Sequence, residues 1–102
     1  MTNSLDRCFV LTPFNPDEGL TLQQAADRAQ KSPGTIRNWC DSEGLGRRIG
    51  GKWYVSKVAL EMFLDGDTGA LCCYLQGDRS SKNVIAYFNR FGLFARRPVN
   101  AG

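Results

Sequence analysis

The chain has 102 residues, of which 42% are hydrophobic and 23% are charged, which is ordinary for a single globular domain. It contains no apolar run of about 18 residues, and its N-terminal stretch lacks the basic region and apolar core of a signal peptide. We therefore expect a cytoplasmic protein with no membrane partner. The net charge of +3 is too small to identify a partner by itself.

The positive charge is unevenly distributed along the chain. Residues 21–56 carry six Lys or Arg against three acids, and residues 79–102 carry five Lys or Arg and no acid. Residues 1–20 and 57–78 are net acidic. Two basic blocks of this kind can form one face for a polyanion.

Metal and disulfide chemistry are not expected. The sequence has no histidine and no Cys-x-x-Cys pair, which argues against zinc. A cytoplasmic chain also keeps its thiols reduced. We interpret the four cysteines as small buried apolar residues: Cys8, Cys40, Cys72 and Cys73.

Catalysis is not expected either. There is no phosphate-cradling glycine motif. Glu61, Asp65 and Asp67 fit the acidic, solvated end of a helix better than a catalytic cluster of carboxylates. We expect a protein that is not an enzyme and that has no cofactor and no metal.

Residues 1–19 are predicted to be an N-terminal arm without a helix, because Pro13, Pro16 and Gly19 interrupt it. Within this arm, CFVLTPF is expected to form an edge strand or a strap over the core. The following stretch, LTLQQAADRAQ, predicts a helix. Thr21 and Gln24 have the spacing of a capping box, and the leucine and alanines of this stretch repeat at helical spacing.

A second short helix is predicted in SPGTIRNWCDSEG. Ser32 is placed to cap it, Pro33 suits its first turn, and Gly44 suits its end. Its buried face comprises Ile36, Trp39 and Cys40. Two short helices joined by a tight turn form a helix-turn-helix pattern.

A β-hairpin is predicted in GRRIGGKWYV, with Gly50-Gly51 as the turn. The expected pairs are Ile49 with Lys52, Arg48 with Trp53 and Arg47 with Tyr54. Trp53 and Val55 are expected to face inward, with Lys52 and Tyr54 facing outward, which makes Tyr54 the candidate for an exposed aromatic.

Three further helices are expected after the hairpin. Ser56 is placed to cap KVALEMFLD, whose apolar side is Val58, Ala59, Met62 and Phe63. A short helix is expected in GALCCYLQG. The last, SSKNVIAYFNRFG, has Ser80 or Ser81 as its cap and Gly92 as its stop, with an inward face of Val84, Ile85, Phe88 and Phe91. The fold class is therefore mainly α with a small β-hairpin, a winged helix-turn-helix with extra C-terminal helices.

This pattern suits recognition of double-stranded DNA. The outer N-terminal half of the second helix is the part that enters a major groove, where Arg can read guanine and Asn can read adenine. Basic residues of the hairpin suit phosphates or a minor groove. The predicted DNA-binding residues are Ser32, Gly34, Thr35, Arg37, Asn38, Arg47, Arg48, Lys52 and Tyr54.

Residues 20–64 resemble the winged helix-turn-helix of the MerR-like superfamily, most closely its excisionase branch. Excisionases are small recombination directionality factors of phages and integrative elements. The motifs that carry the resemblance are QQAAD, SPGTIRNW, EGL and the wing RIGGKWYV leading into SKVALEMFL. In the family, the outer residues of the second helix contact bases and the wing contacts backbone or minor groove. The matching positions are Pro33, Gly34, Thr35, Arg37, Asn38, Arg47, Arg48, Gly51 and Lys52.

Two positions depart from the family pattern. Gln30 stands where the turn usually has Gly, and Lys31 stands where a branched apolar residue usually packs on the domain. The resemblance implies an excisionase-like role with a site-specific recombinase (integrase) as a partner, and it is compatible with repression of transcription. The small size of one helix and one wing predicts self-association on DNA.

Other functions stay open. A MerR-like transcriptional regulator carries the same module. Phage terminase small subunits carry a similar one, which gives a DNA recognition or adaptor protein as a further alternative. A protein-interaction module is the alternative of a different class, with the aromatic segment VIAYFNRFGLF as its surface. The predicted organisation is an arm at 1–19, the DNA-binding domain at 20–66, a helical extension at 67–92 and a basic tail at 93–102 that aids binding without reading sequence.

Overall fold

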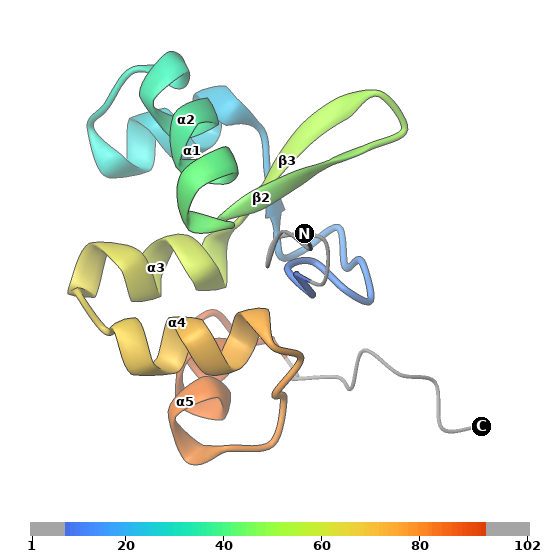
Figure 1. The fold of residues 1–102 in the computed structure, drawn as a ribbon, viewed down its shortest axis with the longest axis vertical. Helices are drawn as coiled ribbons and strands as arrows, with labels where there is room; N and C mark the ends of the chain where they lie inside the picture. The colour runs from blue at the N-terminus through green and yellow to red at the C-terminus, as the bar shows by residue number, and fades with distance from the viewer. Residues whose placement is uncertain (1–7, 94–102) are drawn as a thin grey trace, which may run out of the picture.

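The computed structural model describes residues 8–93, which form five helices and a three-stranded antiparallel sheet (Figure 1). In chain order the elements are β1 (Gly19–Leu20), α1 (Leu22–Ala29), α2 (Pro33–Glu43), β2 (Gly46–Ile49), β3 (Lys52–Ser56), α3 (Lys57–Asp65), α4 (Thr68–Leu75) and α5 (Lys82–Arg90). Among these helices, none has both the length and the apolar character needed to cross a membrane.

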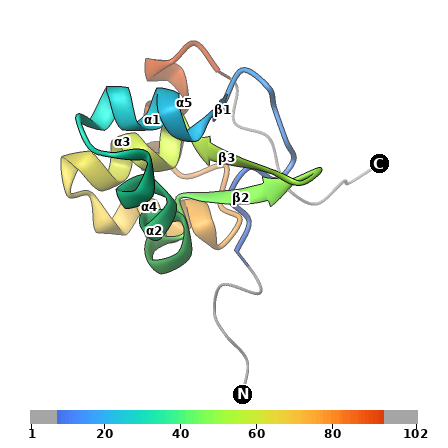
Figure 2. The ribbon, with the colours of Figure 1, turned by 90° about the horizontal axis from the view of Figure 1, so that it is seen from above.

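The helices form two groups on either side of α3. Figure 1 shows α1 and α2 on one side and α4 and α5 on the other, with the β2–β3 hairpin projecting away from the helices. The hairpin projects in the same way when seen from above in Figure 2. This architecture confirms the predicted winged helix-turn-helix with extra C-terminal helices. Strand β1 was not predicted; it pairs with β3 and makes β3 the central strand.

Local capping signals place the helix starts where the sequence predicts them. Thr21 and Gln24 form the reciprocal capping box of α1. The backbone N–H of Thr35 donates to Ser32 Oγ at 3.1 Å at the start of α2. The backbone N–H of Ala59 donates to Ser56 Oγ at 3.0 Å at the start of α3. Each bond satisfies a helix N–H that would otherwise lack a partner.

The turn between α1 and α2 forms despite the two departures from the family pattern. Gln30 has φ 57° and ψ 46°, a left-handed conformation that glycine adopts at little cost. The backbone N–H of Lys31 donates to the carbonyl of Ala26 at 2.9 Å, which closes the end of α1, and its side chain is exposed. The turn thus forms through backbone bonds that do not need an apolar side chain at position 31.

The hairpin register is confirmed. Arg47 pairs with Tyr54, Arg48 with Trp53 and Ile49 with Lys52, and both turn glycines have positive φ. Since directly paired residues lie on the same face of a sheet, Arg48 and Trp53 share one face and Arg47 and Tyr54 share the other.

The segment before β1 is a strap over the core and not an edge strand. Val10 and Leu11 are each 1% exposed, and the backbone N–H of Phe9 donates to the carbonyl of Leu75 in α4 at 2.9 Å. Glu18 is also buried, and its carboxylate accepts hydrogen bonds from the hydroxyls of Ser56 and Tyr74. The strap therefore connects the base of the hairpin to α4.

The C-terminal helices pack on the domain and enlarge its core. Leu71, Tyr74, Val84 and Phe88 belong to the same buried cluster as Ile36 of α2. This arrangement confirms the helix predicted in GALCCYLQG and the inward positions of Val84 and Phe88. It supports a fold-back of this segment over the core, as a small winged domain requires.

The predicted inward face of α5 is wrong at Ile85, while Phe91 packs against the core and Ser81 is the capping residue, as predicted. Ile85 is 36% exposed, Phe91 is only half-buried, and Tyr87, which was not predicted inward, is 6% exposed. Ser81 occupies the capping position of α5 but makes no side-chain capping bond. The buried face is thus rotated, because Tyr87 turns towards the acidic residues between α3 and α4.

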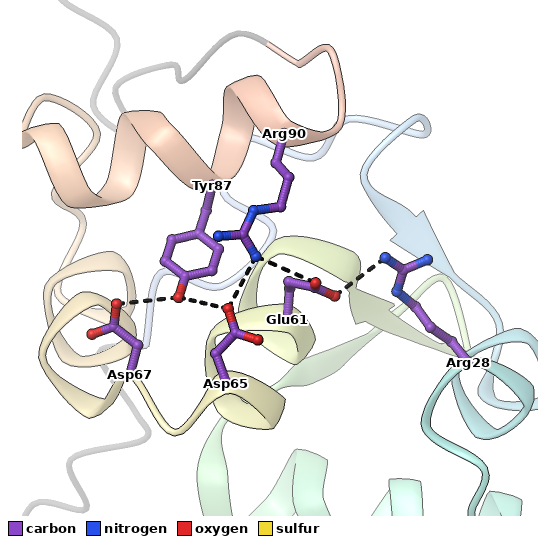
Figure 3. Close-up of polar contacts among 6 residues, drawn as sticks. All are labelled: Arg28, Glu61, Asp65, Asp67, Tyr87 and Arg90. Carbon is purple, nitrogen blue, oxygen red and sulfur yellow. Dashed lines mark hydrogen bonds and ion pairs between the residues drawn. The ribbon is translucent and has the colours of Figure 1, made fainter.

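Those acidic residues also bind the C-terminal helices (Figure 3). Asp65 is exposed at the end of α3, as predicted for a solvated helix end, whereas Glu61 and Asp67 are half-buried. The Tyr87 hydroxyl donates to Asp65 at 3.0 Å and to Asp67 at 3.1 Å. Arg90 pairs with Asp65 at 3.0 Å and with Glu61 at 3.4 Å. Glu61 also pairs with Arg28 of α1 at 3.2 Å, so one chain of polar contacts connects α1, α3 and α5.

We predict that Gly46 cannot be replaced without loss of stability. A Cβ at this position would lie 2.2 Å from the carbonyl oxygen of Tyr54 and 2.8 Å from Cys40 Sγ. Gly46→Ala should lower the free energy of unfolding by about 1–3 kcal/mol, the usual cost of overpacking. Unfolding in urea measures this change in the free energy of unfolding. Gly34→Ala is the control, since the nearest atom to its Cβ is Ser32 Oγ at 3.9 Å. An equal effect of both variants would contradict this packing.

We predict that the Asp65–Arg90 pair makes stability depend on acid pH. The Arg90 guanidinium and the Tyr87 hydroxyl lower the pKa of Asp65 below its ordinary value of 3.8. A lowered pKa in the folded state gives stability that is present above the unfolded value and is lost as pH falls through the folded value. Between pH 6 and pH 2, the urea midpoint of unfolding should fall less steeply for Asp65→Asn than for the parent protein. Asp17→Asn, at an exposed position, is the control and should follow the parent.

Candidate DNA-binding interface

The N-terminal half of α2 presents a polar outer surface. Arg37 and Asn38 are exposed, while Ile36 and Cys40 on the opposite side lie in the core. Thr35 is half-buried, and its Oγ1 accepts a hydrogen bond from Ser32 Oγ at 3.0 Å. Ser32 thus caps the helix as well as lying at its exposed start. The structure brings these predicted residues together on one surface.

Gly34 on this surface has no packing role in the fold. The atom nearest to the position that its Cβ would occupy is Ser32 Oγ at 3.9 Å, an ordinary van der Waals contact, and its φ is not in the positive range that favours glycine. A helix is more stable with alanine than with glycine at such a site. The missing side chain leaves the backbone of α2 open to close approach by a partner.

The hairpin residues divide between its two faces. Arg48 and Lys52 are exposed near the turn, whereas Arg47 donates from its guanidinium to Thr12 Oγ1 in the strap at 2.7 Å. Tyr54 lies on the face of Arg47 and packs on Phe14 with 5.3 Å between ring centroids. The prediction of Tyr54 as an exposed aromatic is wrong, because the strap covers it.

Most other basic residues of the described segment are engaged by the fold. Arg28 and Arg90 form ion pairs with acidic residues. Arg79 is 6% exposed and donates to four backbone carbonyls, including those of Tyr74 and Phe9 at 2.7 Å. Lys57 is half-buried beside the ring of Phe91. Within residues 79–93 the expected second basic block is therefore divided: Arg79 is buried, Arg90 is exposed but ion-paired, and Lys82 is exposed. The remainder of the block, from residue 94, lies outside the described residues.

The exposed basic residues that form no ion pair within residues 8–93 gather around α2 and the hairpin. They are Lys31 in the turn, Arg37 on α2, and Arg47, Arg48 and Lys52 on the hairpin, with Lys82 at the start of α5 as the exception. The C-terminal half of α2 differs, since Asp41 and Glu43 are exposed and acidic there. Exposed positive charge therefore lies at the N-terminal half of α2 and on the hairpin, and not at the C-terminal end of α2.

A groove of about 330 Å³ lies between the C-terminal half of α2 and the hairpin. Cys8 and Cys40 line it, together with Asp41, Arg48 and Trp53 among others. Burial raises the pKa of Cys40 to about 11 and also raises that of Cys8, so both thiols stay protonated near neutral pH. The prediction that all four cysteines are buried is wrong: Cys40 is buried, whereas Cys72 is exposed.

The comparison with known families agrees with this geometry. Residues 20–68 match a family model described as a helix-turn-helix domain. No curated protein and no solved structure gives a significant match. The match supports a helix-turn-helix DNA-binding domain in this part of the chain, with α2 as its second helix.

We predict that α2 and the hairpin contribute differently to binding. Arg37→Ala or Asn38→Ala should relax base preference at one position, with a loss of roughly 1–3 kcal/mol per base contact. Lys52→Ala should weaken binding to all sequences similarly and reduce the salt slope by about one. Fluorescence anisotropy on a selected site and its single-base variants measures both. The division would be contradicted if the α2 variants and the hairpin variant changed base preference and salt slope in the same way.

Proposed function

We propose that this protein binds double-stranded DNA in a sequence-specific manner, with the N-terminal half of α2 in the major groove and the hairpin on the adjacent backbone or minor groove. The observation that carries the proposal is that the exposed basic residues without an ion pair among residues 8–93 gather around α2 and the hairpin. Phosphate contacts from such residues set the position of a protein on DNA, while a few side chains read bases.

The acidic end of α2 limits how this helix approaches DNA. Asp41 and Glu43 would lie against phosphates if the whole length of α2 followed the groove. Entry by the N-terminal end avoids this repulsion and brings Gly34, Arg37 and Asn38 to the base edges. That orientation is the usual one for a recognition helix.

We further propose an architectural, excisionase-like role, in which several copies bind side by side and help a site-specific recombinase to assemble. In the part of the chain that the structure describes, α4 and α5 fold back on the core and do not extend as a long dimerising helix. One short helix and one small wing cover a small surface, which seldom gives high affinity alone. Adjacent copies on tandem sites add affinity, and each wing can bend the duplex slightly.

The same binding would repress transcription where the tandem sites overlap a promoter. This proposal treats the protein as a binding protein without catalytic activity. A MerR-like regulator and a terminase-like adaptor use the same module, and the arrangement of copies on DNA separates them from the excisionase-like role.

Selection from random duplexes, followed by salt titration on the enriched site, tests DNA binding. We expect an enriched motif and a linear fall of log affinity with log salt, with a slope of about 0.9 per neutralised phosphate. The Arg48→Ala, Lys52→Ala double variant should have a smaller slope than the parent. Lys82→Ala is the matched control, because it removes an exposed cation from α5. Absence of an enriched motif together with a flat salt dependence would refute DNA binding.

Gel shifts and footprints on the enriched site test the architectural role. We predict successive bands, a protected stretch that lengthens with concentration, and mobility that varies with the phase of the bend. A single complex on a palindromic site without a bend would refute this role and favour a dimeric regulator. Sequence-specific binding would still stand in that case.

A further inference from the structure

Trp53 lies beside the main candidate for base reading. The guanidinium carbon of Arg37 is 5.1 Å from the centroid of the Trp53 ring. Trp53 is half-buried and packs against the core, whereas Arg37 is exposed. The contact therefore joins a fixed aromatic ring of β3 to a side chain that α2 presents to solvent.

The guanidinium donors of Arg37 have no partner among residues 8–93. Three other arginines of residues 8–93 also lie on aromatic rings: Arg28 on Phe91, Arg79 on Tyr74 and Arg90 on Tyr87. Each of these three also donates hydrogen bonds to a carboxylate or a carbonyl. Arg37 differs because, within the described residues, it has no hydrogen-bond or ion-pair partner. The Arg37 guanidinium therefore contacts the Trp53 ring while its N–H groups remain available to a ligand.

We propose that Trp53 is a positioning residue that holds the Arg37 guanidinium for bidentate reading of a guanine. The inference rests on the proposed function and adds a determinant of its specificity. An exposed arginine samples many rotamers, and ordering it on binding costs entropy. A tryptophan face attracts the guanidinium and restricts these rotamers before DNA arrives. The planar fork then matches the O6 and N7 atoms of guanine.

The position of Trp53 in the hairpin couples the wing to base reading. Its cross-strand partner is Arg48, which lies on the same face and lines the same groove. A wing that contacts the backbone through Arg48 would thereby set the location of the ring that orients Arg37. Trp53 would influence one base pair, although it is not itself a base-contacting residue.

The test is a specificity profile for the parent and three variants. Affinities are measured for the selected site and for every single-base substitution of it. Arg37→Ala identifies the base pair that Arg37 reads. Trp53→Leu should lower discrimination at that pair by about 2–5-fold, the range of an exposed cation–π contact, and leave the ratios at other pairs unchanged. The Arg37→Ala, Trp53→Leu double variant should show no further loss there.

Two control variants distinguish a folding defect of Trp53→Leu from the loss of Arg37 positioning. Trp53→Phe retains an aromatic ring and should recover part of the discrimination. Trp39→Phe changes a tryptophan of α2 that packs on Phe63 in a tilted arrangement, with 4.8 Å between centroids, and should leave every ratio unchanged. In the free protein, the side-chain NMR signals of Arg37 should be shifted upfield by the Trp53 ring and should lose that shift in Trp53→Leu.

The outcomes separate this inference from the proposed function. A parent with a clear motif whose Trp53→Leu variant loses affinity equally for all sequences would overturn the positioning role alone. So would additive effects in the double variant, or an Arg37 signal without a ring-current shift. A parent with no sequence preference would refute the proposed specific binding, and the positioning role with it.

Discussion

The buried carboxylate of Glu18 is the interaction on which the relative positions of the elements depend. It accepts hydrogen bonds from the hydroxyls of Ser56 and Tyr74, and its residue is 3% exposed. Ser56 ends β3 and caps α3, while the Tyr74 hydroxyl also accepts from the backbone N–H of Leu11. A buried polar group that loses its partner costs about 1–3 kcal/mol. Movement of the strap, the hairpin base or α4 breaks at least one of these bonds, so the three parts hold one arrangement.

The features that could be predicted from the sequence are those encoded by a few adjacent residues. The capping box of Thr21 and Gln24, the cap at Ser32 and the Gly50-Gly51 turn each specify a local backbone geometry. Features that depend on distant residues could not be predicted in this way. The burial of Glu18 requires Ser56 and Tyr74, which lie 38 and 56 residues further along the chain. The rotation of α5 likewise depends on acidic residues that precede α4.

The same distinction applies to the candidate DNA-binding interface. Helical spacing separates exposed Arg37 and Asn38 from buried Ile36, so this part of the interface could be predicted from the sequence. Alternation along β3 places Tyr54 on the face opposite Trp53, but it does not indicate that the strap covers that face. Phe14 lies in a segment without periodic hydrophobicity. The contact between Arg37 and Trp53 joins α2 to β3 and has no local signal in the sequence.

The short length of α2 means that its stability depends on packing against the rest of the molecule. A helix of 11 residues is not stable alone, and α2 buries only one side, through residues such as Ile36 and Cys40. The strap and the C-terminal helices supply further core, so the polar side of α2 need not contribute to folding. The C-terminal helices also engage Arg79 and Arg90 in internal contacts. Although the net charge is only +3, the exposed basic residues without an ion pair among residues 8–93 are therefore concentrated around α2 and the hairpin, where we propose that DNA binds. A mild net charge distributed in this way orients a polyanion without attracting it strongly to the whole surface.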